Sequence, residues 1–256
     1  MRAIVVMVAK EPVATQVKTR LCPDLSPAQA AEIYTLFIQD MVEEISGIAR
    51  AEAGLPGCSR QCVRLALAYS PEGAERTFEA ILPIPMPIFP QRGADLGERL
   101  ANIFTKLCGE GYDQVHIINS DSPDMPCSLI HESTKLLEMP QIDLVLGPCA
   151  DGGYYLIGLK KPAPELFEEI PWSTDLVLEL TLERARAVGL SYGLLEPWYD
   201  IDTRDDLMWF LERNRNEKDG CGPGWRTRKY LRDKQIEDRL HSLECRGVKR
   251  HGTGKE

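Results

Sequence analysis

The feature that most constrains the fold is an alternation of two kinds of segment, which runs from the start of the chain to Leu211. Short runs of β-branched and aliphatic residues are followed by longer amphipathic runs, a pattern typical of βα units rather than of a sandwich or a helical bundle. We therefore expect an α/β fold whose mixed, mainly parallel sheet has helices on both faces. Strands are expected at 3–8, 63–69, 87–90, 115–119, 143–147, 154–158 and 191–195, and helices at 27–50, 72–81, 96–108, 128–138, 175–188 and 204–213.

The composition is that of an ordinary globular protein. A chain of 256 residues with 43% hydrophobic residues can bury a proper core. Its aliphatic runs are far shorter than the roughly 18 apolar residues that a membrane-spanning helix needs. We expect no membrane span and, since no signal peptide is visible, a cytoplasmic protein. The eight cysteines are expected to be reduced thiols, because a chain of this size needs no disulfides to fold and because Cys58 and Cys62 lack the second close ligand pair of a zinc site.

Charge is divided unevenly along the chain. The net charge is −9, yet lysine and arginine outnumber aspartate and glutamate in residues 214–256, so the acidic excess belongs to residues 1–213. An acidic body repels phosphate backbones, and we expect no nucleic-acid partner. We predict one domain over 1–213 and a basic C-terminal extension over 214–256, partly helical or disordered. Apolar residues recur at helical spacing from Trp225 to Leu243, before a frayed end at 246–256.

The connection after the first expected strand carries three cations, Lys10, Lys18 and Arg20, and the hydroxyl of Thr19. Open α/β sheets bind their ligands in the loops that follow strands. Three cations on one loop of an acidic body suggest a polyphosphate site, in which lysines act as point charges and arginine as a two-pronged fork. The alternative is a solvated loop that pairs with surface carboxylates.

The loop after the expected strand 115–119 contains Asp121. A carboxylate just beyond a central strand is costly unless it meets a cation or backbone donors. A hard divalent ion such as Mg²⁺ prefers carboxylate oxygens together with substrate phosphates. Asp124, in the same loop, is instead expected to cap the helix that follows Pro126.

In a third loop, Asp151 precedes Gly152 and Gly153, which let the backbone approach a ligand closely. A plain hairpin turn explains these three residues almost as well. No histidine is placed to act as a base for Cys149, so we interpret this cysteine as inert.

The last loop places Asp200 and Asp202 at alternate positions of an extended segment, so both side chains are expected on one side. Both are candidates for a second metal carboxylate opposite Asp121. Thr203 is expected to cap the helix that follows, as Ser26 and Asp95 are for earlier helices.

Five ordered motifs are shared with one family. They are Lys10-Glu11-Pro12 with Val17-Lys18-Thr19-Arg20-Leu21, Gln91-Arg92-Gly93-Ala94-Asp95-Leu96-Gly97-Glu98-Arg99, Ser120-Asp121-Ser122-Pro123-Asp124, Asp151-Gly152-Gly153-Tyr154-Tyr155, and Asp200-Ile201-Asp202-Thr203. Over about residues 2–213 the chain resembles the bacterial nucleotide-diphospho-sugar transferase-like proteins with a GT-A-type, Rossmann-like fold. That family is related to the 2-phospholactate guanylyltransferases and the molybdenum-cofactor nucleotidyltransferases.

The resemblance implies a nucleotide bound over the carboxyl edge of the sheet with a divalent cofactor, Mg²⁺ or Mn²⁺. It implies that Asp121 and Asp202 are the catalytic, metal-binding carboxylates. The implied nucleotide and phosphate site comprises Lys10, Lys18, Thr19, Arg20, Asp95 and Gly97, and the implied substrate site Asp151, Gly152 and Gly153. The family usually has a glycine just before the Val-Lys-Thr-Arg segment, whereas this chain has Ala14-Thr15-Gln16, so a less flexible loop is expected.

Three functions fit these residues. A glycosyltransferase lets an acceptor attack the anomeric carbon of a nucleotide sugar, whereas a nucleotidyltransferase attacks the α-phosphorus of a nucleoside triphosphate and releases pyrophosphate. The whole-chain resemblance favours the first, although the motif at 200–203 resembles the closing motif of the second. The third is a non-catalytic nucleotide-binding protein that meets a partner through its basic tail. The expected partners of an enzyme are a nucleotide-sugar or nucleoside triphosphate donor and an acceptor of unknown identity.

Overall fold

The computed structural model describes residues 1–51, 63–218 and 220–240. The predictions for Cys58, Cys62, Leu243 and residues 246–256 fall outside these residues. Within the described part, seven strands form one sheet in the order β3-β2-β1-β4-β6-β5-β7. No helix in these ranges is both long enough and apolar enough to cross a membrane.

The sheet is mixed and mostly parallel, which confirms the predicted fold class. Among the described strands, β6 alone runs antiparallel to its neighbours, β4 and β5. Its reversal follows from the connection after β5, residues 149–153, which is too short for the crossover that a parallel pair needs. The strands are β1 (Ala3–Lys10), β2 (Val63–Ser70), β3 (Ile88–Pro90), β4 (Gln114–Ile118), β5 (Leu144–Pro148), β6 (Tyr154–Leu159) and β7 (Tyr192–Leu194).

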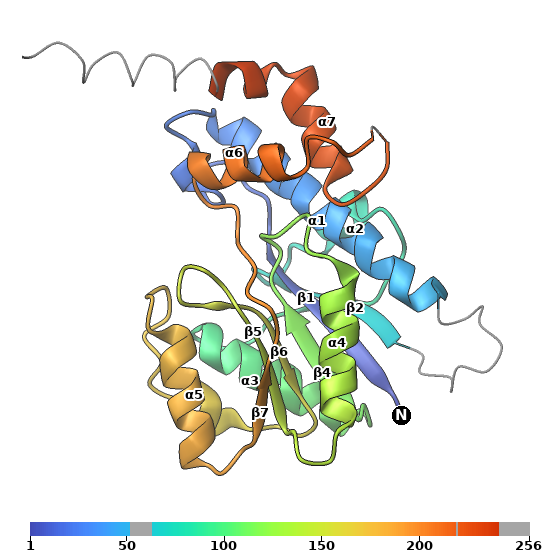
Figure 1. Ribbon diagram of the computed structural model, residues 1–256, viewed down its shortest axis with the longest axis vertical. Coiled ribbons are helices and arrows are strands. Elements are labelled where there is room, and N and C mark those ends of the chain that lie inside the picture. Colours follow the sequence, from blue (N-terminus) through green and yellow to red (C-terminus); the bar gives the residue numbers. More distant parts are fainter. Residues whose placement is uncertain (52–62, 219, 241–256) are drawn as a thin grey trace, which may run out of the picture.

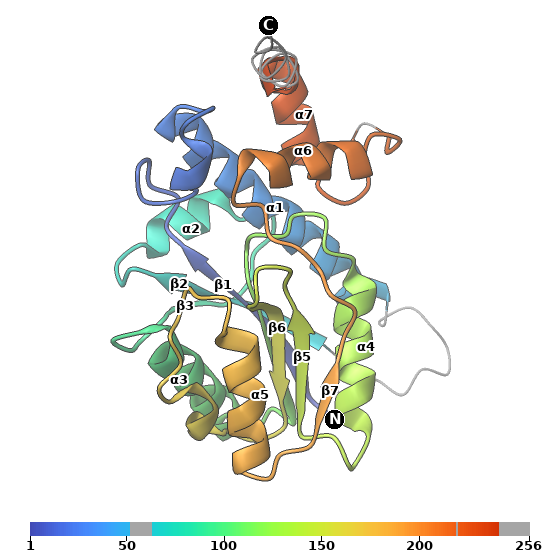
Figure 2. The same cartoon turned by 60° about the vertical axis from the view of Figure 1, so that its left-hand side comes forward.

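Helices cover both faces of the sheet, as Figures 1 and 2 show. One face carries α3 (Leu96–Gly109), α5 (Val177–Ala187) and the short 3-10 helix η2 (Pro164–Phe167). The other face carries α1 (Pro27–Ala51), α2 (Glu75–Ile81) and α4 (Cys127–Glu138). Two further helices, α6 (Arg204–Arg213) and α7 (Trp225–Asp233), lie beside α1 at one end of the molecule.

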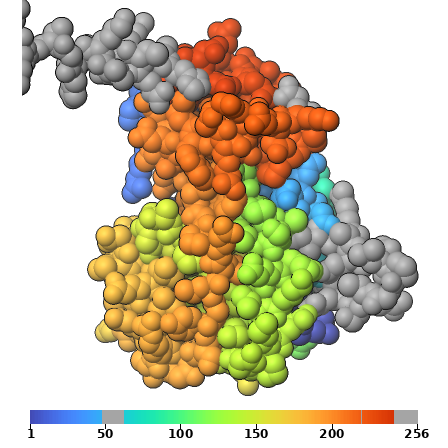
Figure 3. Space-filling model, in the orientation of Figure 1, coloured from blue at the N-terminus to red at the C-terminus, as the bar shows by residue number. Residues whose placement is uncertain are grey.

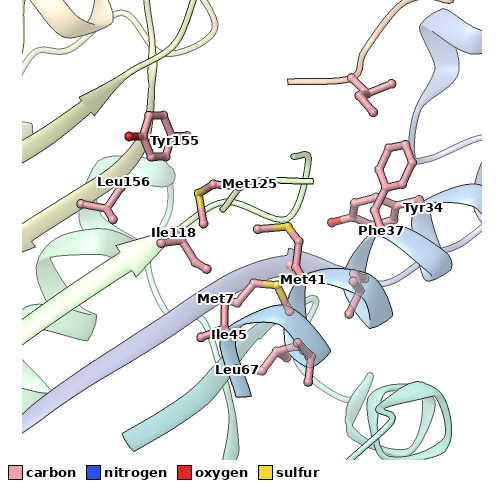
Figure 4. Packing of buried hydrophobic residues seen from close by; sticks show 14 of the residues in the cluster. Met7, Tyr34, Phe37, Met41, Ile45, Leu67, Ile118, Met125, Tyr155 and Leu156 are labelled. Atoms are coloured by element: carbon pink, nitrogen blue, oxygen red, sulfur yellow. The ribbon is translucent and has the colours of Figure 1, made fainter. Parts of the chain in front are cut away.

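The strand β1 shows why the sheet needs helices on both sides. Val5 and Met7 belong to the apolar core under α1, whereas Ile4 and Val6 point the opposite way, into the core under α3. All four side chains are buried. Figure 4 shows Met7 beside Met41 and Ile45 of α1. A strand buried on both faces has a continuous aliphatic sequence, which is the pattern that predicted it.

Capping residues fix where several helices begin. Ser26 Oγ accepts a hydrogen bond from the Gln29 amide at 3.3 Å, and Thr203 forms a capping box with Asp206 at the start of α6, as predicted. The helix α2 begins at Glu75 instead of the predicted residue 72. The reason is a turn in which Gly73 has a φ of +95°, outside the helical region.

The described part of the C-terminal extension packs onto α1. The carboxylate of Asp40, 3% exposed, accepts hydrogen bonds from the backbone amides of Arg226 and Thr227 at 3.0 and 2.9 Å. It also accepts one from the Thr227 hydroxyl at 2.8 Å. Leu231 and Leu240 join the same apolar core as Met7. A buried carboxylate and apolar side chains therefore hold this segment against the body.

Candidate active site

The predicted loops converge at one edge of the sheet. Lys10 ends β1 and Asp121 follows β4, and because these strands are parallel their carboxyl ends lie side by side. The reversal of β6 brings residues 149–153 to the same edge. Residues 195–203 then cross it: the Ile201 amide donates to the Asp121 carbonyl at 2.9 Å. In Figure 3 this orange segment runs over the surface toward α6.

Lys18 lies at the centre of the site. Its Nζ is 2.6 Å from Oδ1 of Asp121 and 2.9 Å from Oδ1 of Asp202, and it donates to the Ile201 carbonyl at 2.6 Å. The lysine side chain is only 4% exposed. Burial acts to lower the pKa of Lys18, but the two carboxylates outweigh it and raise the pKa above the ordinary value. Lys18 is therefore a permanent cation shared between two loops.

The backbone of the first loop explains how Lys18 reaches this position. Lys18 has a φ of 49° and precedes the short 3-10 helix η1 (Thr19–Leu21), while the side chains of Val17 and Leu21 are buried on either side. Thr15 also has a positive φ, 73°. This left-handed conformation is the one that glycine favours, so the chain adopts it in 14–16 without a glycine, at some cost in backbone strain.

Asp202 meets a cation on each carboxylate oxygen. Oδ1 pairs with Lys18, and Oδ2 lies 3.4 Å from Nη1 of Arg20. Burial acts to raise the pKa of Asp202, but Lys18 and Arg20 lower it overall. The Arg20 side chain is 70% exposed, so its pair with Asp202 is weak and its guanidinium is accessible to an anionic ligand.

Asp200 has a different environment from Asp202. Its Oδ1 accepts hydrogen bonds from Nδ2 of Asn119 at 2.7 Å and from the Ser122 hydroxyl at 2.8 Å. Burial and the nearby charge of Asp121 raise the pKa of Asp200 to about 6. The two aspartates were predicted to act alike, but Asp202 contacts cations, whereas Asp200 accepts hydrogen bonds from neutral donors.

Asp124 does not cap α4, and that prediction is wrong. Pro126 occupies the N-cap position, and the amide of Cys127, the first residue of the helix, donates to Oε1 of Glu44 at 3.4 Å. Asp124 is 4% exposed, and its Oδ2 accepts hydrogen bonds from the Tyr199 hydroxyl at 2.5 Å and from Nδ2 of Asn214 at 2.8 Å. The position of Asp124 shortly before α4 suggested a helix cap, but its carboxylate instead binds Tyr199 and Asn214, which lie far along the chain.

The connection between β5 and β6 is a tight turn. Oδ1 of Asp151 accepts a hydrogen bond from the Gly153 amide at 2.9 Å. Gly152 has a φ of +87°, and a Cβ there would lie 2.1 Å from the Asp175 carbonyl oxygen, so only glycine fits. Burial and the charge of Asp200 raise the pKa of the Cys149 thiol, which leaves it protonated, in keeping with an inert cysteine.

Asp95 and Gly97 lie at the start of α3. Asp95 caps the helix by accepting from the Glu98 amide at 2.9 Å, as predicted. A Cβ on Gly97 would lie 3.1 Å from the Trp172 ring and 2.8 Å from the Phe167 carbonyl, so this glycine lets the tryptophan pack closely. Neither is among the described residues that line the cleft.

A cleft along this edge has two halves. The cationic half, about 480 Å³, is lined by Lys10, Lys18, Arg20 and Arg99 together with Thr19. The acidic half, about 400 Å³, is lined by five aspartates: Asp121, Asp151, Asp175, Asp200 and Asp202. Arg20, Asn119, Asp121, Trp172 and Asp202 line both halves, which are therefore adjacent.

Arg99, Asn119 and Asp175 are lining residues that sequence reasoning did not single out. Arg99 belongs to the motif at 91–99, so the resemblance could have identified it. Asn119 was placed at the end of a strand, and its bond to Asp200 spans 81 positions. Nothing in the sequence near Asn119 predicts a contact with a residue so far along the chain.

Residues 57–174 match a family described as "Uncharacterized protein conserved in bacteria (DUF2064)". No curated protein matches the chain. Two solved structures share its fold at low identity, each with a TM-score of 0.51. CMP:2-keto-3-deoxy-manno-octonic acid synthetase complexed with CTP is 12% identical, covering 85% of this chain and 100% of that one. The 4-diphosphocytidyl-2C-methyl-D-erythritol synthase from Anaerococcus prevotii DSM 20548 is 11% identical, covering 84% and 99%.

A much more similar structure comes from Desulfovibrio desulfuricans G20 and is described as a "putative nucleotide-diphospho-sugar transferase". It is 30% identical with a TM-score of 0.79, and the match covers 93% of this chain and 97% of that chain. The likeness thus extends over nearly the whole of both chains. The chain belongs to the nucleotide-diphospho-sugar transferase-like family.

Proposed function

We propose that the protein is a metal-dependent glycosyltransferase that moves a sugar from a nucleoside diphosphate to an acceptor. The observation that carries the proposal is a cleft with two adjacent halves, one cationic and one acidic, which share Asp121 and Asp202 as lining residues. Sugar transfer combines an anionic diphosphate with uncharged reaction partners, the transferred sugar and a hydroxyl acceptor, and the two halves match this division. The family supports a transferase, and a fold neighbour is complexed with a nucleotide, CTP.

The cationic half is the place for the diphosphate. Arg20 is accessible, and its planar guanidinium can bind two phosphate oxygens at once. Lys18, fixed behind it by Asp121 and Asp202, contributes a charge whose position is already set. Lys10 and Arg99 line the same half. Opposite charges held in place before binding reduce the cost of ordering the ligand.

The carboxylates also suit a divalent ion, and the pair proposed here differs from the pair that the resemblance implies, Asp121 and Asp202. Asp202 has a cation on both oxygens, whereas the donors that Asp200 meets among the described residues are neutral. Asn119 links Asp200 to Asp121, whose backbone amide donates to Oδ1 of Asn119 at 3.3 Å. Asp121 pairs with Lys18 through Oδ1. We infer that its other oxygen, Oδ2, holds Mg²⁺ or Mn²⁺ together with Asp200, because these ions prefer such oxygen ligands. A bound ion would neutralise charge on the leaving diphosphate.

In this transfer, the bond between the anomeric carbon and the diphosphate oxygen breaks, and the diphosphate leaves with the bonding electrons. A bond from that carbon to the acceptor oxygen forms, and the proton of the acceptor hydroxyl passes to an aspartate of the acidic half. Arg20 orients the diphosphate, Lys18 supplies a fixed positive charge behind it, and Asp202 keeps both cations in position. Asp121 lines both halves, so the reacting carbon is expected beside it. Correct placement of the two substrates supplies much of the rate enhancement in such reactions.

Nucleotidyl transfer is the second candidate, because the four cations of the cationic half would also suit a triphosphate. An acceptor that attacks through a phosphate or carboxylate, however, would then lie among five aspartates. The negative charges of such an acceptor and of the aspartates repel one another more strongly in a partly buried site than in water. The acidic half therefore favours sugar transfer.

The test is a product assay with a panel of nucleotide sugars and nucleoside triphosphates, with Mn²⁺ or with a chelator. We expect one nucleotide sugar to release its nucleoside diphosphate only when the metal is present. Asp121→Asn should reduce this release at least a hundredfold, whereas Asp238→Asn, which removes the same charge from an exposed position outside the cleft, should not. Pyrophosphate release from a triphosphate would instead establish the second candidate.

A further inference from the structure

We propose that the acceptor is a neutral, hydroxyl-rich molecule of the carbohydrate class, bound in the acidic half with its ring against Trp172. The proposal rests on the proposed function, because it names the second substrate of that transfer. It combines three properties of one cavity: its charge, its hydrogen-bonding chemistry and its aromatic wall.

Charge excludes an anionic acceptor. Five aspartates line the acidic half, and among the described residues that line it Arg20 is the one cation. Lys18 lies behind Asp121 and Asp202, and even with this lysine and a divalent ion added, the negative charges remain in excess. A phosphorylated or carboxylated acceptor would add further negative charge next to these side chains, which repel it.

Hydrogen-bonding chemistry points the same way. An ionised carboxylate only accepts hydrogen bonds, and so does a phosphate dianion, whereas each sugar hydroxyl carries a proton that it can donate. Asp151 and Asp175 are exposed side chains on the rim of this half, on the β5–β6 connection and before α5. The hydroxyl-bearing residues Ser173 and Thr174 line it too. A polyol can donate hydrogen bonds to these carboxylates, which an anion without a proton cannot do.

Trp172 supplies the apolar wall. A Cβ on Gly97 would come within 3.1 Å of its ring, so α3 supports the indole closely from one side. The same residue lines both halves of the cleft. Ligand pockets typically combine hydrophobic and aromatic walls with a few placed polar groups. An indole held rigidly between the donor and acceptor halves provides a flat surface for the apolar face of a sugar ring.

The experiment compares matched pairs of small ligands by saturation-transfer NMR on the full chain, with Mg²⁺ and no nucleotide. The pairs are glucose with glucose 6-phosphate, mannose with mannose 6-phosphate, ribose with ribose 5-phosphate, and glycerol with glycerol 3-phosphate. We expect at least one neutral member to bind, and at least tenfold tighter than its phosphorylated partner. Binding of a phosphorylated member in preference, or of no neutral member, would overturn the proposal.

Variants locate the binding in the cleft. Trp172→Ala should weaken the bound neutral ligand at least tenfold, with Trp172→Phe retaining part of the affinity. Asp151→Asn combined with Asp175→Asn should reduce the discrimination against the phosphate to less than threefold, whereas Glu183→Gln, an exposed residue on α5 outside the cleft, should leave it unchanged. Equal effects of the cleft and control variants would contradict the assignment.

The two proposals fail separately. The acceptor test measures binding of sugars without a donor, so it gives a result even if no nucleotide sugar is a substrate. Release of a nucleoside diphosphate together with preferred binding of the phosphorylated ligands would leave the sugar transfer intact and remove the neutral acceptor. Binding of neutral sugars without any donor cleavage would support the neutral acceptor and contradict the sugar transfer.

Discussion

The ammonium of Lys18, whose side chain is 4% exposed, lies 2.6 Å from the carboxylate of Asp121. The two residues belong to different loops, after β1 and after β4. Asp202, 2.9 Å from the same ammonium, adds a third segment, the one that leads into α6. One buried cation therefore ties together three loops of the cleft, and its removal should affect both stability and binding.

Lys18→Met should lower the free energy of unfolding by about 2 kcal/mol. Breaking a buried ion pair costs roughly 3–5 kcal/mol, and the estimate is reduced here because the Asp121 and Asp202 side chains are 33% and 41% exposed. Urea unfolding at neutral pH measures the change. Lys10→Met, on the exposed last residue of β1, should leave stability unaltered. Equal effects at the two positions would show that Lys18 does not hold the loops together.

Acid should weaken the fold through His116, whose side chain is fully buried between Ser133 and Gln114. Burial lowers the pKa of His116 from 6.5 to about 4. Because the folded-state pKa is the lower one, the unfolded chain binds the proton first. The stabilisation is therefore fully present above about pH 6.5 and lost as the pH falls toward 4.

The loss attributable to His116 between pH 7 and pH 4 should be about 3 kcal/mol. His116→Gln keeps a polar side chain but cannot titrate, so its stability should fall less steeply over this range than that of the wild type. Unfolding curves at several pH values for both proteins give the difference. Parallel pH profiles would refute the assignment.

Gly152→Ala should destabilise the protein by at least about 2 kcal/mol, since it adds a Cβ at 2.1 Å from a backbone oxygen and at a φ of +87°. Gly153→Ala is the matched control. A Cβ at Gly153 meets nothing closer than Oδ1 of Asp151 at 3.2 Å, and this side chain can move. Thermal unfolding of the two variants should separate them clearly, and similar midpoints would contradict the close approach to Asp175.

Asp40→Ala should release the described part of the C-terminal extension from α1. The variant leaves two backbone amides and one hydroxyl without their buried carboxylate partner. Hydrogen bonds to a charged group contribute about 1.5–3 kcal/mol each when broken from one side. Amide exchange of Thr227 and its neighbours should accelerate. Glu32→Gln, which alters the exposed bond to Tyr230, is the control and should change exchange little.

Much of the fold could be predicted because its causes are local. The aliphatic run at 3–8 is a strand buried on both faces, and the helix starts at Ser26, Asp95 and Thr203 follow from short-range hydrogen bonds. The antiparallel direction of β6 also has a local cause, the short connection at 149–153, although the strand pattern alone did not indicate it.

The site was predictable only in part, because its chemistry depends on contacts between distant loops. The cations of the first loop were recognised from their density in an acidic chain. The different environments of Asp200 and Asp202 could not be, since Asn119 and Ser122 approach one and Lys18 the other. Asp124 shows the same limit: its partners Tyr199 and Asn214 lie 75 and 90 positions away.

The central claim is metal-dependent binding of a nucleotide sugar across the cleft, and calorimetric titration tests it most directly. The panel contains nucleoside diphosphates, triphosphates and nucleotide sugars, each with Mn²⁺ and with chelator. We predict that one nucleotide sugar binds more tightly than any triphosphate, and only with metal. Asp121→Asn should abolish the metal dependence, and Arg20→Ala should weaken binding by about 1.5–3 kcal/mol. Binding that is indifferent to metal and to Asp121 would contradict the account.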